Sequence, residues 1–329
     1  MSELVQEIEH ANTIGITGHL RPDGDCVGSC LGLYQYIKDT YPNKMVQVYL
    51  QPFSQEFQIL SGAKQVCHEF RPDQSFDLFI VLDCGALDRI PDFVEYYHSA
   101  KRTVCVDHHI SNQGYGDVCV VDIDASSTAE AVYKLLPREC IGEETATALY
   151  LGIVHDTGVF KYSNTTKQTM RIAGDLIEKG AKPNQVIDET FYKKTYVQNL
   201  LLGKALLNSE LLSEGKVIFS YLLREEFLAL QATSLDVDGI IDQLRITDGV
   251  ECAILLYATD ENSYKVSMRS NSVVNVSEIA LQFGGGGHVR AAGCTISDSS
   301  VEVIKEQLMK EINKQLMSSS KESRRNERV

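Results

Sequence analysis

The stretch TIGITGHLRPDGDCVGS, residues 13–29, joins two apolar segments through a short polar one. TIGIT (13–17) is rich in β-branched residues, as in a buried strand, whereas CVGSCLGLYQYI (26–37) has the pattern of a helix. The polar segment between them contains His19, Asp23 and Asp25. Crowding two carboxylates into one strand-to-helix turn costs free energy because like charges repel. The turn therefore indicates a binding or catalytic role.

Further short apolar segments follow, separated by longer segments with a helical pattern. They are MVQVYL (45–50), LFIVL (78–82), TVCVD (103–107) and DVCVV (117–121). Strands that are apolar throughout and alternate with helices are typical of an α/β domain with a mainly parallel sheet. The sequence therefore predicts an α/β protein with a layered N-terminal domain of this kind.

Acidic and histidine residues directly follow three of these strands. The three blocks contain His19, Asp23 and Asp25; Asp83; and Asp107, His108 and His109. A fourth block, which contains Asp156, follows a helical segment at about 143–155. In open α/β sheets, ligands bind outside the carboxyl ends of the strands. If the strands are parallel, blocks that are distant in the sequence meet at one edge of the sheet.

Divalent cations explain why carboxylates and imidazoles would gather there. Clustered carboxylates repel one another unless cations neutralise them. Mixed Asp and His ligands suit Mn²⁺, Zn²⁺ or Fe²⁺ better than Ca²⁺. Asp23 and Asp25 can diverge toward different ions, and Asp83 is suited to bridge both. Two ions about 3.5–4 Å apart activate a water and bind a phosphoryl oxygen, which predicts hydrolysis of a phosphate ester.

The composition limits the classes of partner and the compartment. The formal net charge of −14 disfavours a protein that holds long duplex DNA, because such binding needs many Lys and Arg residues. No run of about 18 uncharged apolar residues occurs, so we expect no membrane span. Nine scattered cysteines without a C-x-x-C pair argue against disulfides and zinc ribbons. We expect a cytoplasmic protein.

The second half of the chain predicts a smaller C-terminal α/β domain. The predicted boundaries are a catalytic domain over 1–190, a helical linker over 191–214, a second domain over 215–316 and a disordered tail over 317–329. Within the second domain, GGGGH (284–288) can turn backbone N–H groups toward an anion.

Taken together, these motifs resemble those of the DHH phosphoesterase superfamily and its associated C-terminal domain. The resemblance rests on GHLRPDGDCVGS, VLDCG, VDHHISN, HDTGVFKYSNT and GGGGHVRAAG, and it spans nearly the whole chain. It implies an active site in the cleft between two domains. Within the superfamily, the two-domain arrangement resembles bifunctional enzymes that degrade very short RNAs and dephosphorylate 3′-phosphoadenosine 5′-phosphate (pAp) to AMP, with Mn²⁺.

The resemblance also implies roles for individual residues. One ion would be held by His19, Asp23, Asp83 and Asp156, and the other by Asp25, Asp83 and His108. Asp107 would orient an imidazole, and Asp83, His108 and His109 would be catalytic, with the role of His109 open. Substrate would be held by Arg269, Asn271, Gly284, Gly285, Gly286, Gly287 and His288.

Other functions stay open from the sequence. The nearest alternative is a phosphodiesterase for cyclic dinucleotides or linear dinucleotides, which uses the same motifs. A non-enzymatic nucleotide sensor would have lost metal ligands, whereas every expected ligand position is filled here. An inorganic pyrophosphatase would end with a basic motif that the chain lacks, and a long-strand exonuclease is disfavoured by the acidic charge. The ranking of substrates, the polarity of RNA degradation, the metal used in the cell and a homodimeric state stay open.

Overall fold

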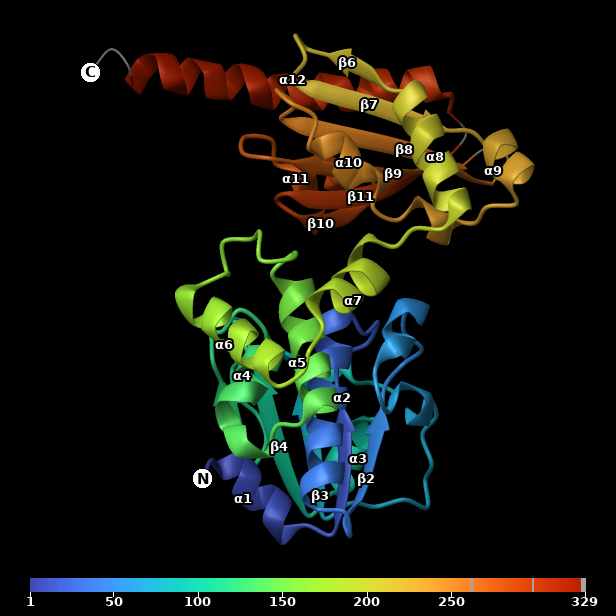
Figure 1. Ribbon diagram of the computed structural model, residues 1–329. Coiled ribbons are helices and arrows are strands. Elements are labelled where there is room, and N and C mark those ends of the chain that lie inside the picture. The colour runs from blue at the N-terminus through green and yellow to red at the C-terminus, as the bar shows by residue number, and fades with distance from the viewer. Residues whose placement is uncertain (261–262, 298, 327–329) are drawn as a thin grey trace. The chain divides into compact units, whose positions relative to one another are not determined.

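The computed structural model describes residues 1–260, 263–297 and 299–326, and the chain forms two compact units. They comprise residues Met1–Lys193 and Lys194–Val329 (Figure 1). The helices and strands of the first unit are α1 (Glu3–His10), β1 (Thr13–Thr17), α2 (Gly24–Thr40), β2 (Met45–Tyr49), β3 (Leu78–Leu82), α3 (Val94–Ser99), β4 (Arg102–Asp107), β5 (Val118–Val121), α4 (Thr128–Leu135), α5 (Glu143–Asp156), α6 (Lys167–Glu178) and α7 (Pro183–Ile187).

The first unit is built on a five-stranded sheet with the order β2-β1-β3-β4-β5, in which every pair is parallel. All five predicted strands are present, and the expected α/β architecture is confirmed. Every residue of β3 is buried. Its residues Leu78, Ile80 and Leu82 pack into the core on one face, whereas Phe79 and Val81 pack into an aromatic cluster on the other. The sheet is therefore covered on both faces.

Helices α2 and α5 pack closely against each other on one face of this sheet (Figure 1). Glycines permit this approach: a Cβ atom on Gly28 would lie 2.6 Å from the carbonyl oxygen of Ala148 and 2.8 Å from the nitrogen of Gly152. The contact matters for function because α2 begins in the polar turn described above and α5 ends at Asp156.

The second unit has its own mixed sheet of six strands. Its elements are α8 (Tyr196–Leu207), β6 (Glu210–Leu212), β7 (Val217–Leu222), α9 (Arg224–Leu230), α10 (Ile240–Arg245), β8 (Cys252–Asp260), β9 (Ser263–Ser270), α11 (Val276–Gln282), β10 (Gly286–His288), β11 (Ala291–Ser297) and α12 (Val301–Asn326). The strand order is β10-β11-β9-β8-β7-β6, with β7 and β8 parallel and the other pairs antiparallel.

Two predicted boundaries differ from the structure. The predicted linker 191–214 contains α8, whose Leu201 and Ala205 are buried in the core of the second unit, and β6, which pairs with β7. The predicted disordered tail is helical as far as Asn326, because α12 continues through a segment that lacks Pro and Gly. Residues 327–329 of that tail lie outside the described residues.

The glycine contact between α2 and α5 generates a prediction for stability. Gly28→Ala should lower the free energy of unfolding by about 1–3 kcal/mol, because the added methyl group overpacks the contact. Gly174→Ala is the matched control, since Gly174 lies in α6 with no atom near its Cβ position. That change should raise the free energy of unfolding by about 0.5–1 kcal/mol. Urea denaturation measures both values, and equal effects would contradict the packing described here.

Candidate metal centre

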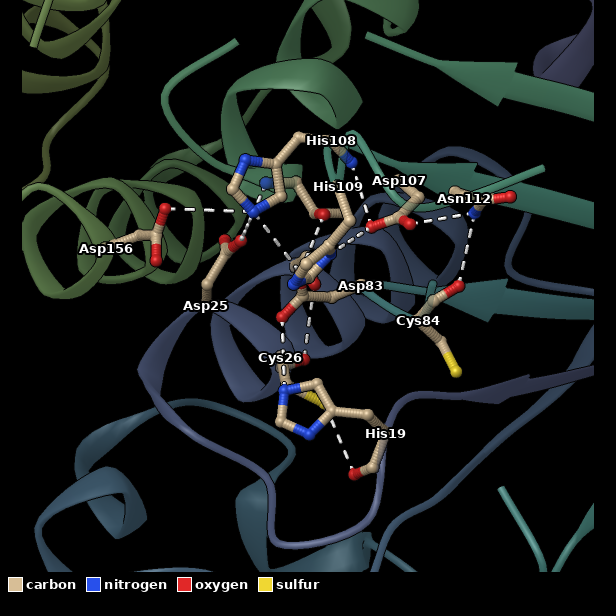
Figure 2. A network of polar contacts seen from close by, with 12 residues as sticks. His19, Asp25, Cys26, Asp83, Cys84, Asp107, His108, His109, Asn112 and Asp156 are labelled. Atoms are coloured by element: carbon tan, nitrogen blue, oxygen red, sulfur yellow. Dashed lines mark hydrogen bonds and ion pairs between the residues drawn. The ribbon is translucent and has the colours of Figure 1, made fainter. Parts of the chain in front are cut away.

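The carboxyl ends of β1, β3 and β4 bring the acidic and histidine blocks together at one edge of the sheet (Figure 2). Asp83 follows β3, Asp107 ends β4, and His108 follows it. Parallel pairing aligns these ends, since Leu82 pairs with Val106 and Thr17 pairs with Val81. The predicted convergence is therefore observed within the first unit.

His19 organises the first of two groups of ligand atoms. Its Nδ1–H donates to the carbonyl oxygen of Leu20 at 2.8 Å, which turns Nε2 toward the carboxylates. Nε2 lies 3.6 Å from Asp23 Oδ2 and 3.4 Å from Asp83 Oδ2. Asp23 is also the N-cap of α2, because its Oδ1 accepts from the N–H groups of Asp25 and Cys26. We call this group of ligand atoms the His19 cluster.

His108 organises the second group. Its Nε2 lies 3.9 Å from Asp25 Oδ2, 3.7 Å from Asp83 Oδ1 and 3.7 Å from Asp156 Oδ2 (Figure 2). We call this group the His108 cluster. Asp156 was expected to share an ion with His19, but the structure groups it with Asp25 and His108. The reason is the helix contact, because Gly152, one turn before Asp156, packs against Asp25.

Asp83 belongs to both clusters. Its Oδ2 faces His19 and its Oδ1 faces His108, and the carboxylate is buried. The backbone of Asp83 is left-handed, with φ of 55°, a conformation that a non-glycine residue rarely adopts. This unusual backbone lies at the residue whose two oxygens face different clusters.

The electrostatics of the site favour bound cations. Burial, with the nearby charges of Asp83 and Asp156, raises the pKa of Asp25 well above its usual range. Burial also raises the pKa of Asp156 to about 6, with a further contribution from Asp83. Such carboxylates resist ionisation unless a cation is present. The donor set of Asp oxygens and His nitrogens therefore fits divalent transition-metal ions.

The pKa of His19 also indicates that the surrounding carboxylates favour a positive charge at this position. Burial opposes a charge on its ring, but hydrogen bonds with Asp23 and Asp83 outweigh burial and raise the pKa of His19 to about 10. Because Nδ1–H is already bonded to the backbone, a proton on Nε2 and a metal ion compete for the same lone pair. A cation at this position would therefore displace that proton.

Asp107 orients the second histidine of the block. Its buried carboxylate accepts from His109 Nδ1–H at 2.7 Å, from Asn112 Nδ2 at 2.8 Å and from the N–H of His108 at 2.9 Å. The imidazole that it orients is therefore that of His109. In the part of the chain that the structure describes, no hydrogen bond or ion pair engages the Nε2 atom of His109, since its polar contacts are made through Nδ1.

Sequence reasoning missed the residues that hold the carboxylates in place. The N–H groups of Thr128 and Ala129 donate to Asp25, and the Thr128 hydroxyl donates to Asp83. Asn164 Nδ2 donates to the carbonyl oxygen of Asp156. One signal was available, because S-T-A-E (127–130) matches a capping box and marks the start of a helix.

The predicted substrate residues of the second unit lie on and beside its sheet. His288 pairs with Ala291, which in turn pairs with Arg269, so the three side chains lie on one face of the sheet. His288 is exposed and Arg269 is half-buried. The next row on this face, Gly286, Gly293 and Ser267, has only small side chains. These residues form a polar face, defined here as the β9–β11–β10 face.

The structure shows how the glycine run and Asn271 are bonded within the protein. Within the glycine run, the N–H groups of Gly284 and Gly285 bond to the end of α11, and Gly286–His288 forms strand β10. The side chain of Asn271 is engaged at both ends, by Arg245 at Oδ1 and by the carbonyl oxygen of Val250 at Nδ2. Asn271 therefore fastens a loop, because its polar atoms are already bonded within the protein.

The chain is similar to known proteins over nearly its whole length. Residues 13–153 match the model described as DHH family, N-terminal domain, and residues 214–318 match that of the DHHA1 domain. A probable bifunctional oligoribonuclease and PAP phosphatase NrnA of Streptococcus mutans is 30% identical, covering 88% of this chain and 91% of its own. The bifunctional oligoribonuclease and PAP phosphatase NrnA of Bacillus subtilis is 28% identical, covering 90% and 93%.

A solved structure has the same fold. The crystal structure of an exopolyphosphatase-related protein from Bacteroides fragilis has a TM-score of 0.82 and 25% identity, covering 93% of this chain and 94% of its own.

The raised pKa of Asp156 predicts how the stability of metal-free protein depends on pH. The folded state binds the Asp156 proton more tightly than the unfolded state does, so this carboxyl lowers the free energy of unfolding as pH rises from about 4 to about 6. Asp156→Asn should remove that loss. Between about pH 4 and pH 7, the metal-free variant should therefore gain about 1–2 kcal/mol relative to the parent protein.

Urea denaturation of both proteins at the two pH values, after treatment with a chelator, measures this difference. Saturating Mn²⁺ at about pH 7 should reverse the order, because the parent protein has one more ligand for the ion. An identical pH dependence in the two metal-free proteins would contradict the electrostatic account of the His108 cluster.

Proposed function

Because the chain belongs to the DHH family, we propose that it hydrolyses short oligoribonucleotides to mononucleotides and pAp to AMP and phosphate. The observation that carries the proposal is the division of the Asp83 carboxylate between the His19 and His108 clusters. A buried carboxylate with one oxygen toward each group of ligands suits a site for two cations. The relatives named as oligoribonuclease and PAP phosphatase support the substrate class.

We propose Mn²⁺ as the cation at both clusters. Mixed carboxylate and imidazole ligands favour a transition-metal ion over Ca²⁺, and the enzymes that the motifs resemble use Mn²⁺. His19, Asp23 and Asp83 would hold one ion, and Asp25, Asp83, His108 and Asp156 the other. When bound, the two ions would supply Lewis-acid activation of a water and neutralise charge on the phosphoryl oxygens.

The remaining chemistry belongs to side chains of the protein. Asp107 keeps a proton on His109 Nδ1, and this hydrogen bond raises the pKa of His109. In the doubly protonated ring, His109 Nε2–H would donate to the phosphate or pass its proton to the leaving oxygen. Burial of Asp25 and Asp83 excludes water from one side of the site, which strengthens electrostatic interactions with the phosphate.

In the second unit, we propose that the β9–β11–β10 face binds the nucleotide. Arg269 and His288 would bind a terminal phosphate, and the small residues between and beside them leave space for the ligand.

The proposed compartment is the cytoplasm. This compartment fits a chain whose nine cysteines are all free, since reducing compartments keep thiols reduced. Within the described residues, no helix combines the length and apolar character needed to cross a membrane.

The substrate proposal is tested by phosphate and nucleotide release with Mn²⁺. The panel comprises pAp, 5′-phosphorylated RNA of two to five nucleotides, and linear and cyclic diadenylate. We expect turnover of pAp and short RNA, and its loss on addition of a chelator. Dominant hydrolysis of cyclic diadenylate would instead favour the cyclic-dinucleotide phosphodiesterase.

Asp83→Asn tests the role of the shared carboxylate. It should reduce turnover by about 10³-fold or more, since bound metal ions stabilise the transition state by several kcal/mol. The side chain keeps its size, so we expect the far-ultraviolet circular dichroism to be unchanged. Mn²⁺-dependent turnover near that of the parent protein would contradict the two-ion site.

Arg269→Ala tests the β9–β11–β10 face. KM for pAp should rise about tenfold or more with kcat little changed, because a charge-assisted hydrogen bond to phosphate is lost. Arg290→Ala is the control, since Arg290 bonds to the carbonyl oxygens of Ser272 and Val274 and fastens a loop. The control should lower stability, measured by urea denaturation. An unchanged KM in Arg269→Ala would contradict phosphate binding by this residue.

A further inference from the structure

The first turn of α4 donates hydrogen bonds to both oxygens of the Asp25 carboxylate. Ser127 is the N-cap of α4 and accepts from the N–H of Glu130 at 3.0 Å. The two N–H groups that directly follow Ser127 bond to Asp25. The N–H of Thr128 donates to Oδ2 at 2.6 Å, and the N–H of Ala129 donates to Oδ1 at 2.9 Å. Free N–H groups at a helix start favour a negative charge, so this turn offsets part of the cost of burying Asp25.

Thr128 also contacts the second buried carboxylate. Its hydroxyl donates to Asp83 Oδ1 at 2.9 Å, and the residue is fully buried. One residue therefore bonds two carboxylates that come from different segments of the chain. The Thr128 hydroxyl bonds to Asp83 Oδ1, which is the oxygen that faces His108. The other oxygen, Oδ2, faces His19.

The turn is itself held firmly in place. The buried Glu130 carboxylate accepts from the Ser126 hydroxyl at 2.7 Å and from the Thr169 hydroxyl at 2.8 Å. Asn164 donates through Nδ2 to the carbonyl oxygen of Ser126 at 2.9 Å and to that of Asp156 at 3.1 Å. The turn is thus bonded, directly or through one side chain, to Asp25, Asp83 and Asp156. Asp25 and Asp156 belong to the His108 cluster, as does Asp83 Oδ1.

We propose that Thr128 is a positioning residue that sets the affinity of the His108 cluster for its cation and leaves the His19 cluster largely unaffected. The hydroxyl fixes the orientation of Oδ1 and occupies one of its lone pairs, so the other lone pair is directed at the cation. This inference rests on the proposed two-cation site. It assigns to one side chain a selective effect on one ion.

Calorimetric titration of metal-stripped protein with Mn²⁺ tests the proposal. The parent protein should bind two ions. Thr128→Val keeps the shape and the N–H but loses the hydroxyl, so one ion should bind about 10–100-fold more weakly while the other is unchanged. Thr128→Ser keeps the hydroxyl and should restore both affinities. Thr128→Ala provides a second variant without the hydroxyl if the valine side chain impairs folding.

Thr145→Val is the matched control. Thr145 is a fully buried threonine in α5, and its hydroxyl has no hydrogen-bond partner in the described part of the chain. The same change of side chain there should leave both Mn²⁺ affinities unchanged. The kinetic readout is the Mn²⁺ dependence of pAp hydrolysis, in which Thr128→Val should need more Mn²⁺, with KM for pAp unchanged at saturating metal.

The outcomes separate this inference from the proposed function. If the parent protein binds two ions and Thr128→Val binds both equally well, the role of Thr128 is refuted while the two-cation site stands. If both ions weaken to the same extent, the selectivity for the His108 cluster is refuted. If the parent protein binds no Mn²⁺, the proposed function itself fails.

Discussion

Repulsion among three carboxylates is the constraint on which the site depends. Asp25, Asp83 and Asp156 converge around one imidazole nitrogen, His108 Nε2, at distances of 3.7–3.9 Å. Within the described residues, the ion pairs of these carboxylates go to imidazoles, so no Lys or Arg neutralises them there. Burial makes this arrangement costly, as the raised pKa values of Asp25 and Asp156 show. Divalent cations offset that cost and give the arrangement a chemical use.

The fold creates this crowding through two structural features. Parallel pairing of β1, β3 and β4 ends the three strands at one edge of the sheet, which delivers His19, Asp83 and His108. The close approach of α2 and α5 then brings Asp156 beside Asp25, and this approach requires glycines at the contact. The left-handed backbone of Asp83 and the first turn of α4 complete the site by directing individual oxygens.

The strands could be predicted from the sequence because each is a short, mainly apolar segment. The convergence of the acidic blocks could be predicted because β1, β3 and β4 are each followed by acidic or histidine residues. The grouping of Asp156 with Asp25 and His108 could not be predicted, because it depends on how two helices pack rather than on any local sequence pattern. Thr128 carries no acidic or metal-binding signature, and only the capping box at 127–130 indicated that a helix begins there. The sequence of the glycine run did not indicate a strand, whereas pairing with β11 makes part of it one.

The central claim is that the carboxylates of the first unit are arranged around two cations. Elemental analysis of protein equilibrated with Mn²⁺ and then freed of excess metal by desalting tests it most directly. The account predicts about two manganese ions per chain, because Asp83 offers one oxygen to each cluster. Protein that retains the fold but carries no manganese after this treatment would contradict it.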